Sequence, residues 1–557
     1  MEKKQSSFVR GAAILGAAGL IVKIIGALFR VPLANQVGPE GMSYYEVAYP
    51  YYSGLLVIAS AGLPTAISKL VSERVTMRDY RGAREVFQTA QKLLCGIGIM
   101  LGLLMFLLAK PLAASSGLDA AYLSFQAFAP ALLFVSIMCA YRGYLQGMQQ
   151  MTGTAVSQIV EQLGKLAIGL ALAVKLLPKG PEYAAMGAII GVTASELIAL
   201  IVIWLMYRLK KRSFDAKLRR SPKTQPRGFG IISKNLLQIA VPVTIGASIS
   251  SLAGIVDVAL IINILTDNLG YETSLAQTAL IIRILLKLGY AKETAQTAFS
   301  LMRTNVATLT NMPGVLTMAL AMSLVPAISA AMAKRDSASV RNASRMGLKL
   351  ALIIGLPCAT GLFVLAKPIL SLLYPRLTEA ELALAADLMH TAAIGVVFLS
   401  MVQTMTGVLQ GMGKQNVPVF NLFIGFLLKV VTLIFLMNLP SVNIQGAAVS
   451  TVVCYAFAGI ADTIYTARRA RLKLPLFDVF GKPLSASLAM GAAVHFAYAA
   501  LAKSGHTTLA TLGAVCAGVA VYAVLVALLR MFSYDELALI PGGTKLRRLL
   551  YPKGQNK

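Results

Sequence analysis

The chain contains many apolar stretches of about twenty or more residues, the length that a helix needs to cross the hydrocarbon core of a bilayer. Of its 557 residues, 57% are hydrophobic and only 13% are charged, whereas a soluble protein would carry about 25% charged residues. A backbone surrounded by lipid has to satisfy its hydrogen bonds internally, so these stretches are expected to be α-helices. The sequence therefore predicts an all-α integral membrane protein.

About fourteen transmembrane helices are expected, at 10–33, 44–70, 86–109, 121–146, 153–177, 184–207, 236–264, 298–331, 345–366, 382–409, 416–438, 443–467, 483–503 and 507–531. An even number places both termini on one side of the membrane. Four basic loops also lie on that predicted side, at 74–84, 208–227, 334–345 and 468–473. Because short loops rich in Lys and Arg stay cytoplasmic, both termini are expected in the cytoplasm.

Three short motifs occur twice in the same order, which indicates an internal repeat. The copies are LPTAIS at 63–68 and LVPAIS at 324–329, LAKPLA at 108–113 and LAKPIL at 365–370, and LQGM at 145–148 and 409–412. Lys165 and Lys429 follow the two LQGM motifs at the same distance. Each copy would hold six helices in the same orientation. That arrangement predicts two pseudo-symmetric lobes around a cavity, related by an axis along the membrane normal.

The expected domains follow from this repeat and from a basic stretch between the two copies. From Arg208 to Lys234 this stretch contains ten Lys and Arg but only one acidic residue. They are an N-terminal lobe (1–207, helices 1–6), a basic cytoplasmic linker (208–235), a C-terminal lobe (236–473, helices 7–12), two further helices (474–531) and a basic cytoplasmic tail (532–557). The outer connection at 266–298 contains an apolar stretch, Leu275–Leu288, that is interrupted by Arg283 and Lys287. It predicts an amphipathic helix on the outer surface.

The formal charge of +28 does not indicate nucleic-acid binding, because the basic residues lie mainly between apolar spans rather than among aromatic residues on one face. Their placement favours membrane topology and attraction to anionic lipids. The five cysteines show no metal-ligand spacing, so no metal site is expected.

Charged residues inside apolar spans are costly, so each is a candidate for function. Lys23 and Arg30 share one face of helix 1 with small residues, and two cations there would suit an anionic group. Alternatively, Arg30 extends to the outer interface. Arg303 precedes Thr304, Thr308 and Asn311 at helical spacing, which predicts a polar stripe facing the cavity. Alternatively, Arg303 extends to the outer interface. Lys429 has Gly425 where the first copy has an acid, and is a second candidate for an anionic ligand.

The intramembrane acids are candidates for ion coupling or gating. Glu161 and Lys165 are four residues apart, so they form either a structural ion pair or part of a ligand site. Glu196 and Asp257 could each bind a coupling proton or cation. Glu46, near the outer start of helix 2, is either a gate residue or a solvated one.

Enzyme motifs are missing. GMGKQ at Gly411–Gln415 lacks the spacing of a phosphate-binding loop and follows a helix rather than a strand. No large outer loop carries the clustered acids that a membrane glycosyltransferase or ligase would need. A transporter without a cofactor, driven by Na⁺, H⁺, the membrane potential or substrate flow, is expected.

Several segments resemble stage V sporulation protein B-like polysaccharide transporters of the MOP flippase superfamily, which includes Gram-positive lipid II flippases. They are KIIGALFRVPL at Lys23–Leu33, GPEG at 38–41, AYPY at 48–51 and GLPTAISKL at 62–70, with MPG and VPAIS at 312–329 as the matching second-lobe helix. The resemblance covers essentially the whole chain.

The resemblance implies a flippase of the bacterial plasma membrane. It would move undecaprenyl-diphosphate-linked sugars, such as the peptidoglycan precursor lipid II, to the outer leaflet by alternating access. In lipid II flippases of this superfamily, cations on helices 1, 2 and 8 engage the diphosphate. Lys23 and Arg30 match the helix 1 pair approximately. Relative to Pro313, Arg303 lies earlier in the chain than the family's helix 8 arginine. Helix 2 has Ser60 and Lys69 in place of a deep arginine.

Cell-wall synthesis proteins are candidate partners. Two other functions stay open at this stage. One is an ion-coupled efflux antiporter of the same fold, which would want acids in its cavity if its cargo were organic cations. The other is a membrane-embedded glycan polymerase or ligase.

Overall fold

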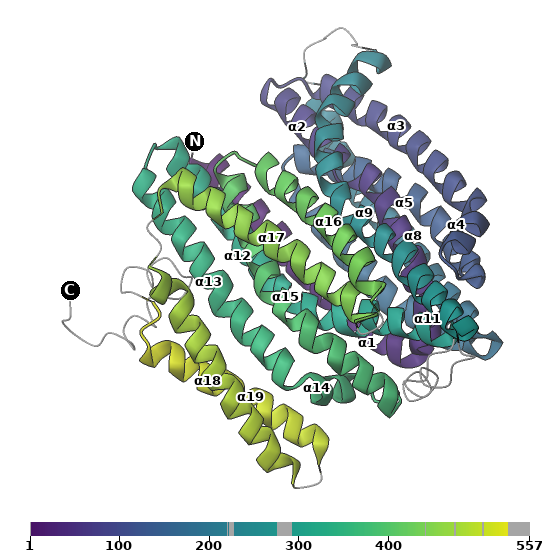
Figure 1. Cartoon of the computed structure of the whole chain (residues 1–557). Coiled ribbons are helices and arrows are strands. Elements are labelled where there is room, and N and C mark those ends of the chain that lie inside the picture. Colours follow the sequence, from purple (N-terminus) through teal and green to yellow (C-terminus); the bar gives the residue numbers. More distant parts are fainter. Residues whose placement is uncertain are drawn as a thin grey trace. The chain divides into compact units, whose positions relative to one another are not determined.

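The computed structural model describes residues 2–219, 221, 228–275, 292–439, 442–472, 475–503 and 506–532 (Figure 1). Almost all of these residues are helical, and no strand occurs within these ranges. The all-α fold class predicted from the apolar spans is therefore confirmed.

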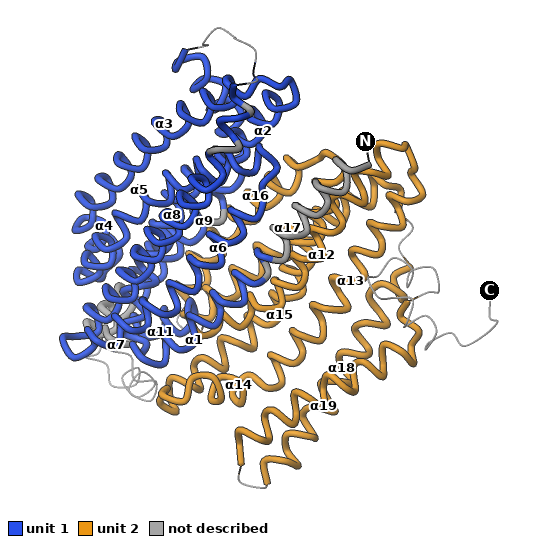
Figure 2. Tube along the Cα trace, turned by 180° about the vertical axis from the view of Figure 1, so that it is seen from behind, with its two compact units in different colours: residues 1–304 blue, residues 305–557 orange. Residues whose placement is uncertain are grey.

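The helices form two compact units, residues 1–304 and 305–557 (Figure 2). Unit 1 contains α1 (Glu2–Ser60), α2 (Leu63–Thr76), α3 (Tyr80–Leu107), α4 (Ala109–Ser115), α5 (Tyr122–Gly147), α6 (Met151–Gly164), the π-helical turn η2 (Lys165–Gly169), α7 (Leu170–Leu176), α8 (Pro181–Arg219), α9 (Phe229–Leu275) and α11 (Lys292–Ser300), with short 3₁₀ turns η1 (Asp119–Ala121) and η3 (Leu177–Lys179). The π-helical turn η4 (Leu301–Val306) crosses the division. Unit 2 contains α12 (Ala307–Ala333), α13 (Ser337–Val364), α14 (Ala366–Leu373), α15 (Glu379–Gly411), α16 (Asn416–Met437), α17 (Gln445–Ala470), η5 (Phe477–Gly481), α18 (Lys482–Ala502) and α19 (Thr507–Leu528).

Within the described residues, 12 helices are long and apolar enough to cross a membrane, so the expected count of fourteen is not confirmed. One difference lies in helix 1 and helix 2, which the structure joins into the continuous stretch Ile21–Thr76. Its break is at Gly38, where a φ of 75° interrupts α1 just before Pro39. The other lies at 153–177, where η2 divides the expected span into α6, η2 and α7.

The two units repeat the same succession of elements. α3 and α13 each have 28 residues, and each is followed at once by a short helix, α4 or α14. Both long helices begin at an aspartate N-cap. The side chain of Asp79 accepts a hydrogen bond from the Gly82 amide, and that of Asp336 accepts from the Ala338 and Ser339 amides. The repeat seen in the motifs is thus present in the helix lengths and caps of each unit.

Close helix packing is repeated as well. In unit 1, a Cβ at Gly143 of α5 would lie 2.9 Å from the Pro64 carbonyl oxygen of α2. In unit 2, a Cβ at Gly407 of α15 would lie 2.8 Å from the Ala321 carbonyl oxygen of α12. Glycine is therefore required at the same place beside each LQGM motif, because any side chain would meet the backbone of the neighbouring helix.

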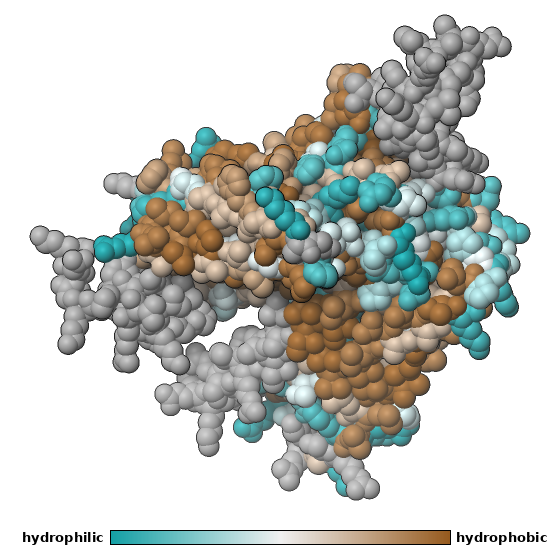
Figure 3. Space-filling view, turned by 90° about the horizontal axis from the view of Figure 1, so that it is seen from below, coloured by the Kyte–Doolittle hydropathy of each residue, from teal (hydrophilic) through white to brown (hydrophobic). Residues whose placement is uncertain are grey.

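Each unit buries an apolar core and exposes apolar side chains outward. The unit 1 core includes Ile67, Phe87, Leu94 and Met138 from α2, α3 and α5. Large apolar residues remain exposed, among them Leu107, Phe496 and Leu528, each more than 70% exposed. Figure 3 shows hydrophobic side chains gathered in broad patches on the face in view. Such exposure suits a surface covered by lipid.

Unit 2 also contains an apolar cavity of about 420 Å³ between α13, α15, α17 and α18. It is lined by Leu352, Leu356, Val397, Phe398, Met401, Ile460, Thr463, Ile464, Phe480 and Leu484.

Most of the expected amphipathic helix Leu275–Leu288 lies outside the described residues. α8 continues through Arg219 and α9 starts at Phe229, but the lobe boundaries remain a prediction, as does the cytoplasmic location of both termini.

Candidate functional site

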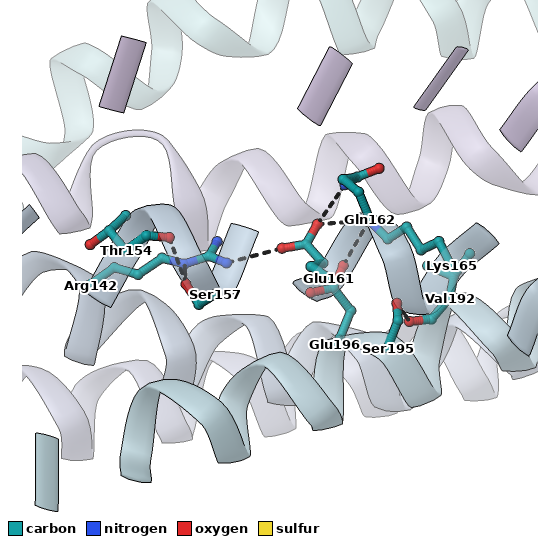
Figure 4. Close-up of polar contacts among 9 residues, drawn as sticks. All are labelled: Arg142, Thr154, Ser157, Glu161, Gln162, Lys165, Val192, Ser195 and Glu196. Atoms are coloured by element: carbon teal, nitrogen blue, oxygen red, sulfur yellow. Dashed lines mark hydrogen bonds and ion pairs between the residues drawn. The ribbon is translucent and has the colours of Figure 1, made fainter. Parts of the chain in front are cut away.

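Four charged side chains form one network inside unit 1, which we call the unit 1 charge cluster: Arg142, Glu161, Lys165 and Glu196. Arg142 Nη2 donates to Glu161 Oε2 at 3.0 Å, and Lys165 Nζ donates to Glu161 Oε1 at 2.8 Å. Lys165 Nζ also lies 3.1 Å from Glu196 Oε1. Figure 4 shows the side chains of α5, α6, η2 and α8 converging on this network. The alternation of cation and carboxylate makes it neutral overall.

The local backbone explains how Lys165 reaches two helices. Lys165 is the first residue of the π-helical turn η2, and such turns within α-helices occur frequently at functional sites. Just before it, a Cβ at Gly164 would lie only 2.7 Å from the Ser195 Cβ, so α6 and α8 approach closely there. Lys165 can therefore contact Glu161 on its own helix and Glu196 on the next.

Glu196 is the most enclosed member of the cluster, with its side chain 2% exposed. Its Oε2 has no hydrogen-bond partner among the described residues, and neither has the hydroxyl of Tyr52, which lies within electrostatic range of Glu196 and Lys165. A buried polar atom without a partner is unusual and marks a place where a proton, water or ligand would be stabilised.

A second charge pair joins the two arms of α1 across the Gly38 break. Arg30 Nη1 lies 3.1 Å from Glu46 Oε1, and the Arg30 guanidinium lies 5.4 Å from the centre of the Tyr49 ring. Glu46 is completely buried, so the alternative that it is a solvated residue is wrong, and its role as a gate residue stays a prediction. Tyr49 and Tyr52 both pack against Phe128, and Tyr45 lies within electrostatic range of both Arg30 and Lys165. Aromatic rings therefore connect this pair with the unit 1 charge cluster.

A third pair lies between α9 and η4. Arg303 Nη1 is 3.3 Å from Asp257 Oδ2, and a Cβ at Gly254 would lie 3.6 Å from Arg303 Nη2. Arg303, like Lys165, lies in a π-helical turn. Of the expected polar stripe, Thr304 and Thr308 are buried, whereas Asn311 is exposed.

The remaining candidates differ in burial. Lys23 is exposed on α1, while Lys429 of α16 is 7% exposed. A Cβ at Gly26 would lie 3.6 Å from Gln162 Oε1, so the small-residue face predicted for helix 1 does admit α6. Gln162 in turn donates to Glu161.

The three groups hold four cations and four carboxylates. Each of these cations has a carboxylate oxygen within 3.3 Å. The sequence located Glu161 and Lys165 as a pair and the other acids as isolated residues. It missed Arg142, whose signal is a charge inside the apolar span 121–146, and the buried Asp462 of α17. Among the residues that the structure describes, no group of three or more His, Cys, Asp or Glu is placed to hold a metal ion.

Membrane-spanning helices in a repeated arrangement, with charge pairs buried among them, define a multi-pass membrane transporter rather than an enzyme. The model of the family described as polysaccharide biosynthesis protein matches residues 8–332, and the MatE model matches residues 304–435. The chain belongs to the polysaccharide biosynthesis protein family, within the MOP superfamily.

Three relatives from Bacillus subtilis (strain 168) are similar over most of the chain. The uncharacterized membrane protein YabM is 28% identical, covering 98% of this chain and 97% of the relative. Stage V sporulation protein B is 26% identical, covering 96% and 98%. Lipid II flippase MurJ is 24% identical, covering 83% and 82%.

Solved structures show the same fold. Lipid II flippase MurJ in an inward closed conformation superposes with a TM-score of 0.67 at 14% identity, covering 93% of this chain and 98% of that one. An inward-facing multidrug resistance MATE family transporter of the MOP superfamily gives 0.65 at 15% identity, covering 81% and 94%. The predicted resemblance to this superfamily is confirmed.

Proposed function

We propose that this transporter is a flippase for undecaprenyl-diphosphate-linked sugar precursors, with lipid II for peptidoglycan as the first cargo to test. It would carry the headgroup from the inner to the outer leaflet of the bacterial plasma membrane by alternating access, with both termini in the cytoplasm. Support comes from relatives named as a lipid II flippase and a stage V sporulation protein, and from the buried cations of unit 1.

The observation that carries the proposal is that three cations inside unit 1 each contact a carboxylate. Arg30 and Arg303 lie within candidate membrane-spanning stretches, and Lys165 lies in η2, inside the span that the sequence predicts at 153–177. An unpaired charge at the bilayer centre costs about 3 kcal/mol on insertion scales. Phosphate oxygens accept from Lys and Arg donors with the same charge-assisted geometry as carboxylate oxygens. A diphosphate can therefore replace the carboxylates without leaving a cation unpaired.

This exchange also assigns a role to the acids. When cargo takes over Arg30, Lys165 or Arg303, the released Glu46, Glu196 or Asp257 would be a buried anion without a partner. Binding a proton or a sodium ion would neutralise it. Cargo entry and ion uptake would thus occur together, and cargo release would restore the ion pairs. No cofactor is needed. Anionic lipids and cell-wall synthesis proteins would be neighbours rather than parts of the site.

The second candidate is an ion-coupled efflux antiporter for small molecules. The MatE match over residues 304–435 and the fold shared with a MATE transporter favour it. In that case the carboxylates would bind a cationic drug, and Lys165 and Arg303 would pair with them while no drug is bound.

The test is to deplete a host's own lipid II flippase, express this chain and measure lipid II exposed on the outer leaflet. Lys165→Ala and Arg303→Ala should abolish any rescue. Lys175→Ala is the matched control, because Lys175 follows in the same segment but is exposed. Its rescue should equal that of the parent.

Three results would contradict the proposal. Absence of rescue combined with drug resistance would favour the antiporter. Glycan polymerisation by the purified protein would indicate an enzyme. Full rescue by both alanine variants would show that these cations do not handle the cargo.

A further inference from the structure

Asp462 of α17 is an acid buried completely within unit 2, in a helix long and apolar enough to cross the membrane. Asn421 Nδ2 of α16 donates to its Oδ1 at 2.7 Å. The second oxygen, Oδ2, has no hydrogen-bond partner among the residues that the structure describes. One neutral amide satisfies only part of an ionised carboxylate, which can accept about four hydrogen bonds.

Nothing nearby supplies the missing charge. The helices that pack most closely against α17 are α13, α15 and α16, and η5 and α18 face it across the apolar cavity. The titratable side chains of these elements and of α17 itself are Arg341, Arg345, Lys349 and Cys358 on α13, Glu379, Glu381, Asp387 and His390 on α15, Lys429 on α16, Cys454, Tyr455, Tyr465, Arg468 and Arg469 on α17, Asp478 on η5, and Lys482, His495 and Tyr498 on α18. Asp478 and Lys482 pair with each other at 2.6 Å. Within the described residues, no cation lies in ion-pair distance of Asp462, and its side-chain hydrogen-bond partner is the Asn421 amide.

Lys429 is the cation on α16, eight residues beyond Asn421. Two helical turns separate them, about 12 Å along the axis. Asp462 therefore differs from Glu46, Glu161, Glu196 and Asp257, each of which contacts a cation.

The same face of α17 offers a second polar atom in the same condition. Thr466 follows Asp462 by four residues, is completely buried, and has a hydroxyl without a hydrogen-bond partner in the described part of the chain. Thr463, by contrast, donates to the Gly459 carbonyl at 2.7 Å. A carboxyl group with one free oxygen thus lies on the helix face that carries an unsatisfied hydroxyl.

We propose that Asp462 is a proton-binding site, whose Oδ2 takes up one proton from water and returns it to water while Asn421 holds Oδ1. In the protonated form the group is neutral, as its apolar surroundings require, and its O–H can donate. No other atom is exchanged. That this proton is coupled to cargo movement rests on the proposed function, whereas proton binding itself does not.

Infrared difference spectroscopy on the full-length protein in liposomes measures this directly. The carbonyl stretch of a protonated buried carboxylic acid should appear as the pH is lowered from about 8 to about 4, down to the ordinary range of a carboxyl group. It should shift in D₂O and be lost in Asp462→Asn, which keeps the shape and the contact to Asn421. Asp257→Asn is the matched control, since Asp257 is ion-paired, and should leave the band in place.

Asn421→Ala separates titration from a purely structural role. Removing the amide that stabilises the ionised oxygen should keep the proton bound to higher pH, so the band should persist further into the alkaline range. An Asp–Asn contact that only joins α16 to α17 would give no titrating band to move.

A spectrum unchanged over this pH range, or a titrating band with the same amplitude in the parent and in Asp462→Asn, would overturn the proposal. A band that Glu196→Gln removes and Asp462→Asn leaves belongs to Glu196, whose Oε2 is also buried without a partner in the described residues. A band that responds to sodium at constant pH but not to pH would also overturn the proposal, because the bound ion would be sodium. The band reports protonation alone, so a failed flipping assay leaves this result unaffected.

Discussion

Glu196 Oε1 lies 3.1 Å from Lys165 Nζ, although the two residues belong to different helical segments of unit 1. The same ammonium group also donates to Glu161, so one cation neutralises two carboxylates with the help of Arg142.

Lys165→Met should therefore destabilise the protein strongly. The substitution leaves Glu196 buried with no counter-charge, and removing one partner of a buried ion pair costs about 3–5 kcal/mol. Replacing Glu196 with leucine in the same chain should recover most of that loss. Urea unfolding in detergent would measure both. If the free energy of unfolding of Lys165→Met alone lay within about 1 kcal/mol of the parent's, the assigned burial of Glu196 would be contradicted.

Arg30 and Glu46 should be energetically coupled across the break at Gly38. In a double-mutant cycle with Arg30→Ala and Glu46→Ala, we expect a coupling free energy of about 1–3 kcal/mol, because Glu46 is buried and Arg30 also contacts Tyr49. The matched control is the pair Lys367–Glu379, which is slightly closer at 2.9 Å but has side chains 55% and 84% exposed. Its coupling should be below about 1 kcal/mol. Equal couplings for the two pairs would argue against a buried Arg30–Glu46 pair.

Gly143→Ala and Gly407→Ala should each destabilise their own unit. Both new methyl groups would meet a neighbouring backbone carbonyl oxygen at less than 3.0 Å, and overpacking of this kind typically costs about 1–3 kcal/mol. Gly96→Ala on α3 is the control, because no atom lies within 4 Å of the position of its Cβ. It should be neutral or stabilising by about 0.5–1 kcal/mol. Thermal unfolding would rank the three, and a destabilised Gly96→Ala would contradict the packing argument.

Asp336→Ala should lower stability in a pH-dependent way. The hydrogen bond from the Ser339 hydroxyl, followed by the one from the Ser339 amide, lowers the pKa of Asp336 below its ordinary value. A lowered folded-state pKa means that the cap stabilises α13 above the unfolded-state pKa and loses this effect as the pH falls through the folded-state pKa. The parent and the variant should therefore differ in unfolding midpoint at neutral pH and converge in acid below about pH 4.

Asp387→Ala provides the comparison, since Asp387 is an exposed acid within α15 and caps no helix. Its difference from the parent should be small. A gap between Asp336→Ala and the parent that widens in acid would have the wrong sign for this cap.

The helical fold was predictable because lipid restricts the chain to helices, and the repeat was predictable because motifs in one register recur. The structure gives that register a physical reason in Gly143 and Gly407, which occupy the same place beside LQGM and meet a neighbouring helix in the same way. The span count was harder to predict. Hydropathy does not reveal that η2 adds a π turn at Lys165 or how the chain continues around Gly38.

The candidate site was predictable as a set of residues but not as a set of pairs. Glu161 and Lys165 are four apart on one helix, so sequence spacing alone brings them together. The contacts Lys165–Glu196, Arg303–Asp257 and Arg142–Glu161 join different helices, and their distances depend on packing that no local pattern encodes. The sequence does not single out Arg142, which lies close to the end of its span, where a snorkelling arginine is the usual explanation.

The balance of four cations and four carboxylates within unit 1 has an electrical consequence. Moving one elementary charge through 100 mV corresponds to about 2.3 kcal/mol. Because these eight side chains have no net charge, the membrane voltage would exert almost no net force on them while the transporter is empty. A bound pyrophosphate headgroup would add about two negative charges, so the voltage would act on the loaded transporter unless protons entered with the cargo. In a cell that is negative inside, the voltage would then drive the loaded step outward and leave the return step unassisted.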